Sequence, residues 1–317
     1  MLPKRVLRDE NGAVLVLVTA MIIVLLGFAS FAVDVGAAAV EKRKMQNAAD
    51  AAALAGGMEL PINSSLAQDR AVEYATKNGA DSTQVVTSVS EDKSTITVSV
   101  GKEHDFRFAR VLGFHKVDIK AKAKARVAPA TGVLGCIPFV LKDQELEVGQ
   151  EYKLKLFPPG GGEDNDGNPF VIYLGPGNFG CIDYNNTPED DDLKDQNFLN
   201  NLKYGYPGLI NVGDEFKPLT GNRSELTKEG VEYRISEGGD ALVVYIPMVT
   251  GFPISGASDM FTVVGFAAFE INSSKPPGDG NQSEVHGWFK QYVLPADNDE
   301  TLKEYGVLGV KLVDIDS

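Results

Sequence analysis

The chain has 317 residues, of which 43% are apolar and 23% are charged. This composition is usual for a globular protein and is too polar for a membrane protein with many spans. Its net charge of −14 is uneven, because residues 1–131 hold 17 Lys or Arg against 14 Asp or Glu, whereas residues 132–317 hold 13 against 30. This asymmetry indicates two parts with different surroundings, and the acidic part argues against nucleic acid as a partner, since phosphate contacts need Lys or Arg.

The chain opens with a segment that is long and apolar enough to cross a membrane. No charged side chain occurs in Asn11–Val33, and residues 13–33 would form a helix of about 31 Å, which matches the hydrocarbon core of a bilayer. A cytoplasmic N-terminus is favoured by the basic residues that precede this run, Lys4, Arg5 and Arg8. We therefore expect a basic cytoplasmic segment at residues 1–11, one transmembrane helix at residues 12–33, and all later residues outside the cytoplasm.

A cleaved secretory signal is the alternative interpretation of the same segment. The sequence Ser30-Phe31-Ala32 has small residues at the two positions that a signal peptidase requires. However, the apolar stretch is longer than the core of a signal peptide, which has roughly 7–15 residues. We therefore expect the N-terminus to remain attached.

The helix is predicted to continue from lipid into water. No proline occurs between Ala13 and Ala55, and Asp34 marks the outer boundary of the membrane. Small residues recur at the four-residue spacing that lets helix backbones approach closely, and alanine has the highest helix propensity. These residues would pack either against the protein's own first domain or against another helix in an assembly. The candidate packing residues are Gly27, Ala32, Asp34, Gly36, Ala48, Ala51, Ala52 and Ala55.

A series of short motifs runs through this stretch without a gap: Gly12-Ala13, Gly27-Phe28-Ala29, Ala32-Val33-Asp34-Val35-Gly36 and the run from Gln46 to Ala55. In these motifs the segment resembles the N-terminal region of the TadE/TadG-like Flp pilus-assembly proteins of bacteria. The resemblance implies a single-pass membrane protein with one long pilin-like helix, half in lipid and half supporting a head outside the cell. The partners that it implies are the lipid bilayer and other pilus-assembly subunits or the pilin.

One departure from the pilin pattern concerns processing. Processed prepilins are cut after a glycine and carry a glutamate five residues into the mature chain, whereas a cut after Gly12 would place Leu17 there. The resemblance therefore implies an accessory subunit that does not polymerise, rather than a major pilin.

Residues 34–130 are predicted to combine the outer half of the long helix with a small α+β pilin-like domain. A second helix is expected over Ser65–Ala80, with Gly79 as its C-terminal stop, and the runs around the polar sequence EDKS predict a β-hairpin. The sequence FRFARVLGF predicts a short helical turn. In VDIKAKAKARV, apolar residues alternate strictly with basic ones, which predicts a half-buried strand. Its basic stripe would face solvent, anionic lipid or the acidic domain.

Residues 131–317 are predicted to form an acidic, β-rich, sandwich-like domain, since proline and glycine in VAPATGVLG mark a boundary. One helix is expected in DLKDQNFLNNLKYG. Strand-like runs are separated by Gly, Pro and Asp turns. The runs are Ile137–Leu141, Tyr152–Phe157, Phe170–Leu174, Ala241–Val249, Phe261–Ile271, Val285–Leu294 and Val307–Val313.

Few residues suit a metal, a cofactor or catalysis. The chain has two cysteines, Cys136 and Cys181, and three histidines, and we expect no structural zinc site from so few candidate ligands. The cysteines either form a disulfide outside the cell or remain two buried thiols. Gly175, Gly177 and Gly180 fit a dinucleotide pattern, but no helix is expected after them. The acidic loops at residues 163–168 and 188–193 are more typical of turns and solvated loops than of calcium sites.

The sequence thus predicts an α+β protein in which a long N-terminal helix carries a pilin-like domain, followed by a β-rich domain. We expect no metal, no cofactor and no enzyme activity. The favoured function is that of a membrane-anchored accessory protein that assembles or anchors a Flp/Tad-type pilus. The alternative is a membrane-anchored extracytoplasmic binding module whose acidic domain recognises a cell-wall or environmental ligand.

Overall fold

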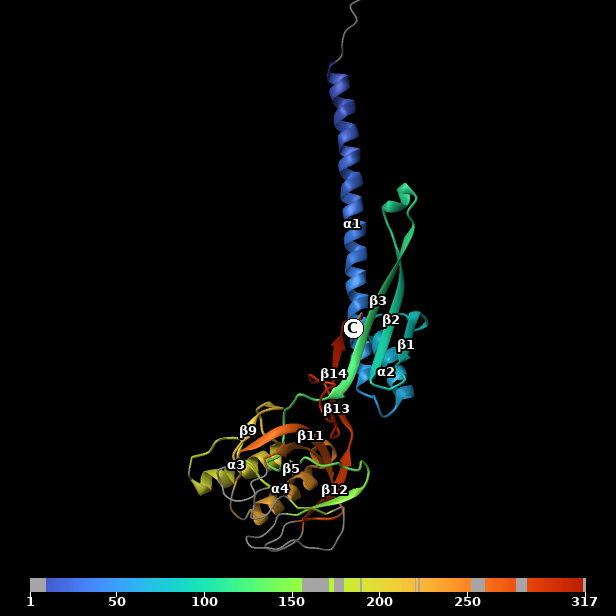
Figure 1. Cartoon of the computed structure of the whole chain (residues 1–317). Helices are drawn as coiled ribbons and strands as arrows, with labels where there is room; N and C mark the ends of the chain where they lie inside the picture. The colour runs from blue at the N-terminus through green and yellow to red at the C-terminus, as the bar shows by residue number, and fades with distance from the viewer. Residues whose placement is uncertain are drawn as a thin grey trace, which may run out of the picture.

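The computed structural model describes residues 10–155, 171–173, 180–188, 190–219, 221, 223–251, 260–277 and 284–315. Its helices are α1 (Glu10–Gly57), α2 (Ser64–Lys77), α3 (Asp191–Tyr204) and α4 (Ser224–Glu237), with short 3₁₀ turns η1 (Ser82–Gln84), η2 (Ala109–Leu112) and η3 (Gly239–Leu242). The α+β class, with a long apolar N-terminal helix and a β-rich C-terminal region, is confirmed (Figure 1).

Helix α1 is one unbroken rod of 48 residues, roughly 72 Å long at 1.5 Å per residue (Figure 1). Its first half projects away from the rest of the protein, and the large apolar side chains from Val14 to Val33 are 45–71% exposed. No residue in the most apolar stretch of α1 is buried within the structure. The half-helix is therefore long and apolar enough to cross a bilayer, and it lacks any covering from the described part of the chain.

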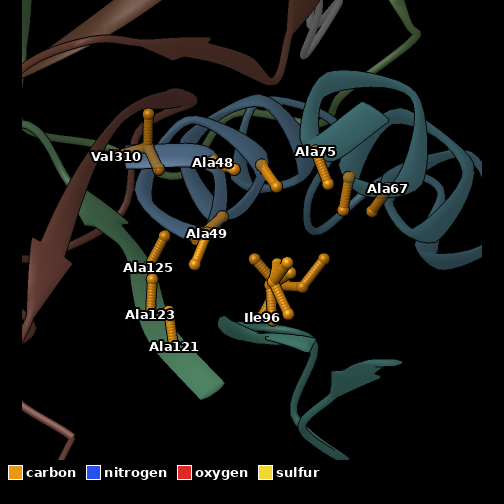
Figure 2. Packing of buried hydrophobic residues seen from close by; sticks show 14 of the residues in the cluster. Ala48, Ala49, Ala67, Ala75, Ile96, Ala121, Ala123, Ala125 and Val310 are labelled. Carbon is orange, nitrogen blue, oxygen red and sulfur yellow. The ribbon is translucent and has the colours of Figure 1, made fainter. Parts of the chain in front are cut away.

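The second half of α1 is the core of the first folded unit. Figure 2 shows alanines of α1 facing alanines of a neighbouring strand, with Ile96 beneath α1 and α2. Because alanine has no side chain beyond Cβ, the helix backbone can approach the sheet closely. The contributing alanines are Ala48, Ala49, Ala52 and Ala53 of α1, Ala67, Ala71 and Ala75 of α2, and Ala121, Ala123 and Ala125 of the strand.

Helix α2 is confirmed, with a start one residue earlier than predicted. Its N-cap is Asn63, whose side-chain oxygen accepts a hydrogen bond from the Leu66 N–H at 3.0 Å. Asparagine is as good an N-cap as serine, and Asn63 lies where its side chain reaches this free N–H.

The first sheet has the strand order β1-β2-β3-β14-β13, and β1, β2, β3 and β14 are antiparallel neighbours. The predicted alternation of the basic strand is confirmed in β3, where apolar residues are buried from Ile119 to Val127. The predicted hairpin and short helical turn are confirmed as β1–β2 and η2. The strands are β1 (Val85–Val89), β2 (Thr95–Asp105), β3 (Lys116–Pro129), β13 (Tyr292–Leu294) and β14 (Val307–Val313).

Strand β14 returns to this first sheet after the whole acidic region. It pairs with β3 from Leu308↔Pro129 to Val313↔Lys124. The acidic region therefore leaves the first sheet after β3 and rejoins it at β13 and β14. A domain boundary near residue 131 remains a prediction, and the pairing shows that residues beyond it also belong to the first sheet.

The second sheet has the order β5-β10-β11-β12-β6-β7, with β9 paired to β11, and a small third sheet joins β4 to β8. Helices α3 and α4 cover one face of the second sheet through Phe198, Leu202 and Val231. In the predicted sandwich, a further sheet would cover that face instead. The strands are β4 (Gly132–Val133), β5 (Leu141–Lys142), β6 (Glu151–Lys155), β7 (Val171–Tyr173), β8 (Ile210–Asn211), β9 (Glu215–Phe216), β10 (Val243–Thr250), β11 (Phe261–Ile271) and β12 (Glu284–Lys290).

Helix α3 was predicted, whereas α4 was not. Gly230 lies in the middle of α4, where a Cβ atom would come within 2.6 Å of Leu202 in α3. A glycine at this crossing permits close helix packing, but it weakens the local helix signal. The loop at residues 163–168, Gly175, Gly177 and Glu189 of the second acidic loop lie outside the described residues.

The end of α1 gives a test of the close packing. A Cβ atom at Gly56 would lie 2.6 Å from Cδ1 of Ile96 and 2.8 Å from the backbone oxygen of Ala67. We expect Gly56→Ala to destabilise the protein by ~1–3 kcal/mol, because the Ala67 carbonyl cannot rotate away. Chemical unfolding of the full chain in detergent measures this change.

The matched control is Gly36→Ala in the same helix, where nothing lies within 4 Å of an added Cβ atom. That change should leave stability unaltered or raise it by up to ~1 kcal/mol through helix propensity. Equal unfolding midpoints for Gly56→Ala and the native protein would contradict the packing described here.

Candidate functional site

The candidate site is the length of α1 where its lipid-type half meets its core half. Strands β2 and β3 rise beside the middle of the helix, and the η2 turn joins them at the tip (Figure 1). The contact between helix and tip is made by Asp34, the first charged residue after the apolar run.

The Asp34 carboxylate is 2% exposed and accepts three backbone hydrogen bonds. Its Oδ1 accepts from the Arg107 N–H at 3.0 Å, and its Oδ2 accepts from Phe108 and Ala109 at 2.9 and 2.7 Å. These N–H groups open the η2 turn, whose N-cap residue, Phe108, has no side chain that can accept them. Asp34 therefore caps this turn from another part of the chain.

These hydrogen bonds keep Asp34 ionised. Burial alone would raise the pKa of Asp34, but the bonds from Ala109, Arg107 and Phe108 together outweigh burial and lower the pKa from its ordinary value of 3.8. The sequence predicts Asp34 as a packing residue at the water boundary. Its role as a cap was missed, because backbone N–H partners leave no mark in the sequence.

The face of α1 that begins at Asp34 continues into the core. Glu41 pairs with Lys102 of β2, and this hydrogen bond is the main cause of the lowered pKa of Glu41. About a third of a turn around the helix from that face, Gln46 donates to the backbone oxygen of Lys122 at 3.0 Å. The residues at 34, 41 and 48 are spaced seven apart on one helix face. Polar contacts thus hold the hairpin to α1 above the alanine core.

The other predicted packing residues fall into two groups. Ala48 and Ala52 are fully buried, and Ala51 and Ala55 are half-buried beside them. Gly27, Ala32 and Gly36 are exposed, and open space surrounds both glycines. Contact of this second group with another helix remains a prediction.

The basic stripe of β3 has more than one environment. Lys120 and Lys122 are exposed, whereas Arg126, at the end of the stripe, pairs with Glu300 of the acidic region at 2.9 Å. Of the alternatives that the sequence left open for the basic stripe, contact with the acidic region is therefore made at Arg126.

Cys136 and Cys181 are free, buried thiols and do not form the candidate disulfide in the structure. They lie in different hydrophobic clusters, Cys181 with Phe139 and Phe198, Cys136 with Tyr184 and Phe261. Burial raises the pKa of both thiols, that of Cys181 to about 12. Both are therefore poor nucleophiles in the folded protein.

The described residues offer little for catalysis or metal binding. No group of three or more His, Cys, Asp or Glu residues within them could hold a metal ion. His286 lies 4.0 Å from Glu151 and 3.7 Å from Glu284, but these carboxylates also pair with Lys275 and Lys153. Burial, followed by the two lysines, lowers the pKa of His286. The group is an ion-pair network on a sheet face.

The Asp34 cap can be tested by hydrogen exchange. We expect Asp34→Ala to increase amide exchange at residues 107–109, because three N–H groups lose their acceptor. Asp69→Ala, which removes an exposed carboxylate of α2, is the matched control and should leave that exchange unchanged.

The same contact sets a pH dependence. Since the folded state lowers the pKa of Asp34, its stabilisation is complete above pH 3.8 and is lost as the pH falls through the lower folded value. The extra protection of residues 107–109 relative to Asp34→Asn should therefore decrease as the pH falls below 3.8 and disappear once the pH is below the folded pKa. Equal protection in both proteins at pH 7 would contradict the cap.

A comparison with protein families identifies the segment that carries this site. Residues 12–59 match the family described as putative Flp pilus-assembly TadE/G-like. No curated protein and no solved structure matches the chain. The match begins within α1, ends just after it and includes Asp34, which confirms the resemblance seen in the sequence. The segment that forms α1 is thus TadE/G-like, and this finding points to a part in Flp pilus assembly.

Proposed function

We propose that the protein is a non-catalytic accessory subunit, anchored in the bacterial cell membrane, that assembles or anchors a Flp-type pilus. One observation carries this proposal. The TadE/G-like match coincides with a helix whose first half is apolar and exposed and whose second half is the core of a folded unit. Such a helix can hold a head at a membrane without a flexible joint.

The proposed orientation has the N-terminus in the cytoplasm and both large sheets outside. It is supported by the basic residues before the apolar run, which the cytoplasmic side favours. From Asp34 to Gly57 the helix adds about 35 Å, and the acidic region lies beyond that end in Figure 1. Because electrostatic screening acts over about 8 Å at physiological salt, this spacing keeps the acidic region clear of anionic lipid headgroups.

The accessory role is supported by two features of α1. Leu17 stands where a polymerising pilin would carry glutamate. In addition, Val40 is exposed just outside the membrane boundary, one turn after Gly36, where nothing lies within 4 Å of an added Cβ atom. We propose that this face meets another pilus-assembly subunit, since small residues let helix backbones approach closely.

The orientation is tested by cysteine labelling. The native thiols are buried, so a cysteine at Val148, which is 57% exposed in the acidic region, should be the reactive site of Val148→Cys. We expect a membrane-impermeant maleimide to label this variant in intact spheroplasts and to leave the native protein unlabelled. Labelling that requires lysis would refute the proposed orientation.

The function is tested in the bacterium that encodes the protein. Deletion of the gene should remove surface Flp-type pili while the pilin is still synthesised, and the native gene should restore them. A photo-crosslinking residue at Val40 should capture a pilus-assembly subunit, whereas the same residue at the exposed Val86 of β1 should not. Normal piliation in the deletion strain would sink the proposal and favour a separate binding role.

A further inference from the structure

The tip of the β2–β3 hairpin exposes an apolar surface of three residues, Phe108, Val111 and Phe114. Their exposed fractions are 47%, 91% and 63%. The turn at the other end of β2 contrasts with it, since residues 90–94 are Ser, Glu, Asp, Lys and Ser. One strand therefore has a polar turn at one end and an apolar tip at the other. Exposed apolar residues gathered on one tip are typical of a surface that binds a protein or a membrane.

The position of the apolar tip identifies that partner. The tip is hydrogen-bonded to Asp34 through residues 107–109, and Asp34 directly follows the apolar run of α1. If α1 crosses a bilayer up to Val33, these bonds hold the tip at the level where the bilayer ends. Figure 1 shows the tip beside the middle of α1, at the end of the first sheet nearest the apolar half.

The charges around the tip suit the same surface. Residues 106–116 hold Arg107, Arg110 and Lys116 and no acidic residue. Two of these basic residues pair with carboxylates of β2, Lys116 with Glu103 at 2.8 Å and Arg110 with Asp105 at 3.3 Å, which leaves residues 103–116 with a net charge of +1. Aromatic and basic side chains together are typical of segments that lie in the membrane interface.

We infer that the hairpin tip inserts Phe108, Val111 and Phe114 into the outer interface of the membrane that α1 crosses. The protein thus holds the bilayer at two points, a spanning helix and a shallow loop, and the Asp34 contact fixes the distance between them. Two points restrict how far the head can tilt relative to the membrane, which a single helix in lipid would allow more freely. This inference rests on the proposed membrane anchoring.

The test uses the full chain in vesicles of phosphatidylethanolamine and phosphatidylglycerol, with no other protein present. A polarity-sensitive fluorophore is attached to Val111→Cys, and nitroxide lipids act as quenchers. We expect a blue-shifted emission that lipids with a nitroxide near the headgroup quench more than lipids with a nitroxide at mid-chain. Phe114→Cys repeats the measurement at a second position.

Two control variants separate the inference from the anchoring. Val24→Cys, in the apolar half of α1, should be quenched most at mid-chain, and Val86→Cys, an exposed valine of β1, should be quenched by neither lipid. If Val111 behaves like Val86 while Val24 is quenched, the anchor stands and the tip contact is refuted, so that another protein must cover the tip. If Val24→Cys also remains unquenched, the membrane anchoring and the tip contact are both refuted.

Discussion

The carboxylate of Asp34 joins a helix to a hairpin through three backbone N–H groups, and the arrangement of the first unit follows from this contact. Without it, β2 and β3 would extend past the alanine core with nothing to hold their far end. With it, the hairpin stays parallel to α1 over a long distance. The contact depends on charge, since backbone N–H groups form stronger hydrogen bonds with an ionised carboxylate than with a neutral carboxyl group.

The alanine packing below Asp34 reflects the two environments of one helix. A helix with large apolar residues along its whole length would be insoluble in water, and one with many charges could not enter lipid. Helix α1 avoids both by changing from Val, Leu, Ile and Phe in the apolar half to alanine in the core half. Since alanines bury little area each, the contact must be long and close, and α2, β2, β3 and β14 all share in it.

Local patterns in the sequence predicted most individual elements. The apolar run, the strict alternation of β3 and the polar hairpin turn are short-range signals, and each led to the element that the structure has. The pairing of β14 with β3 was not predictable in this way, because residues 129 and 308 are distant in sequence and many strands could serve as partner. Helix α4 was missed because Gly230, which its packing requires, reads as a helix breaker. The state of Cys136 and Cys181 depended on where the tertiary fold places them, which spacing does not reveal.

Because β14 belongs to the first sheet but comes last among the strands in sequence, the first unit can fold completely only after β14 has been synthesised. Strand β3 is an inner strand only when β14 lies beside it, and β14 is synthesised after the entire acidic region. Until then, β3 presents an unpaired edge, and Gly57 lacks the contact with Val310 that covers it. Exposed edges are sites of aggregation and of recognition by quality-control factors. A chain interrupted before β14 is synthesised would keep that edge exposed and would be open to aggregation or degradation.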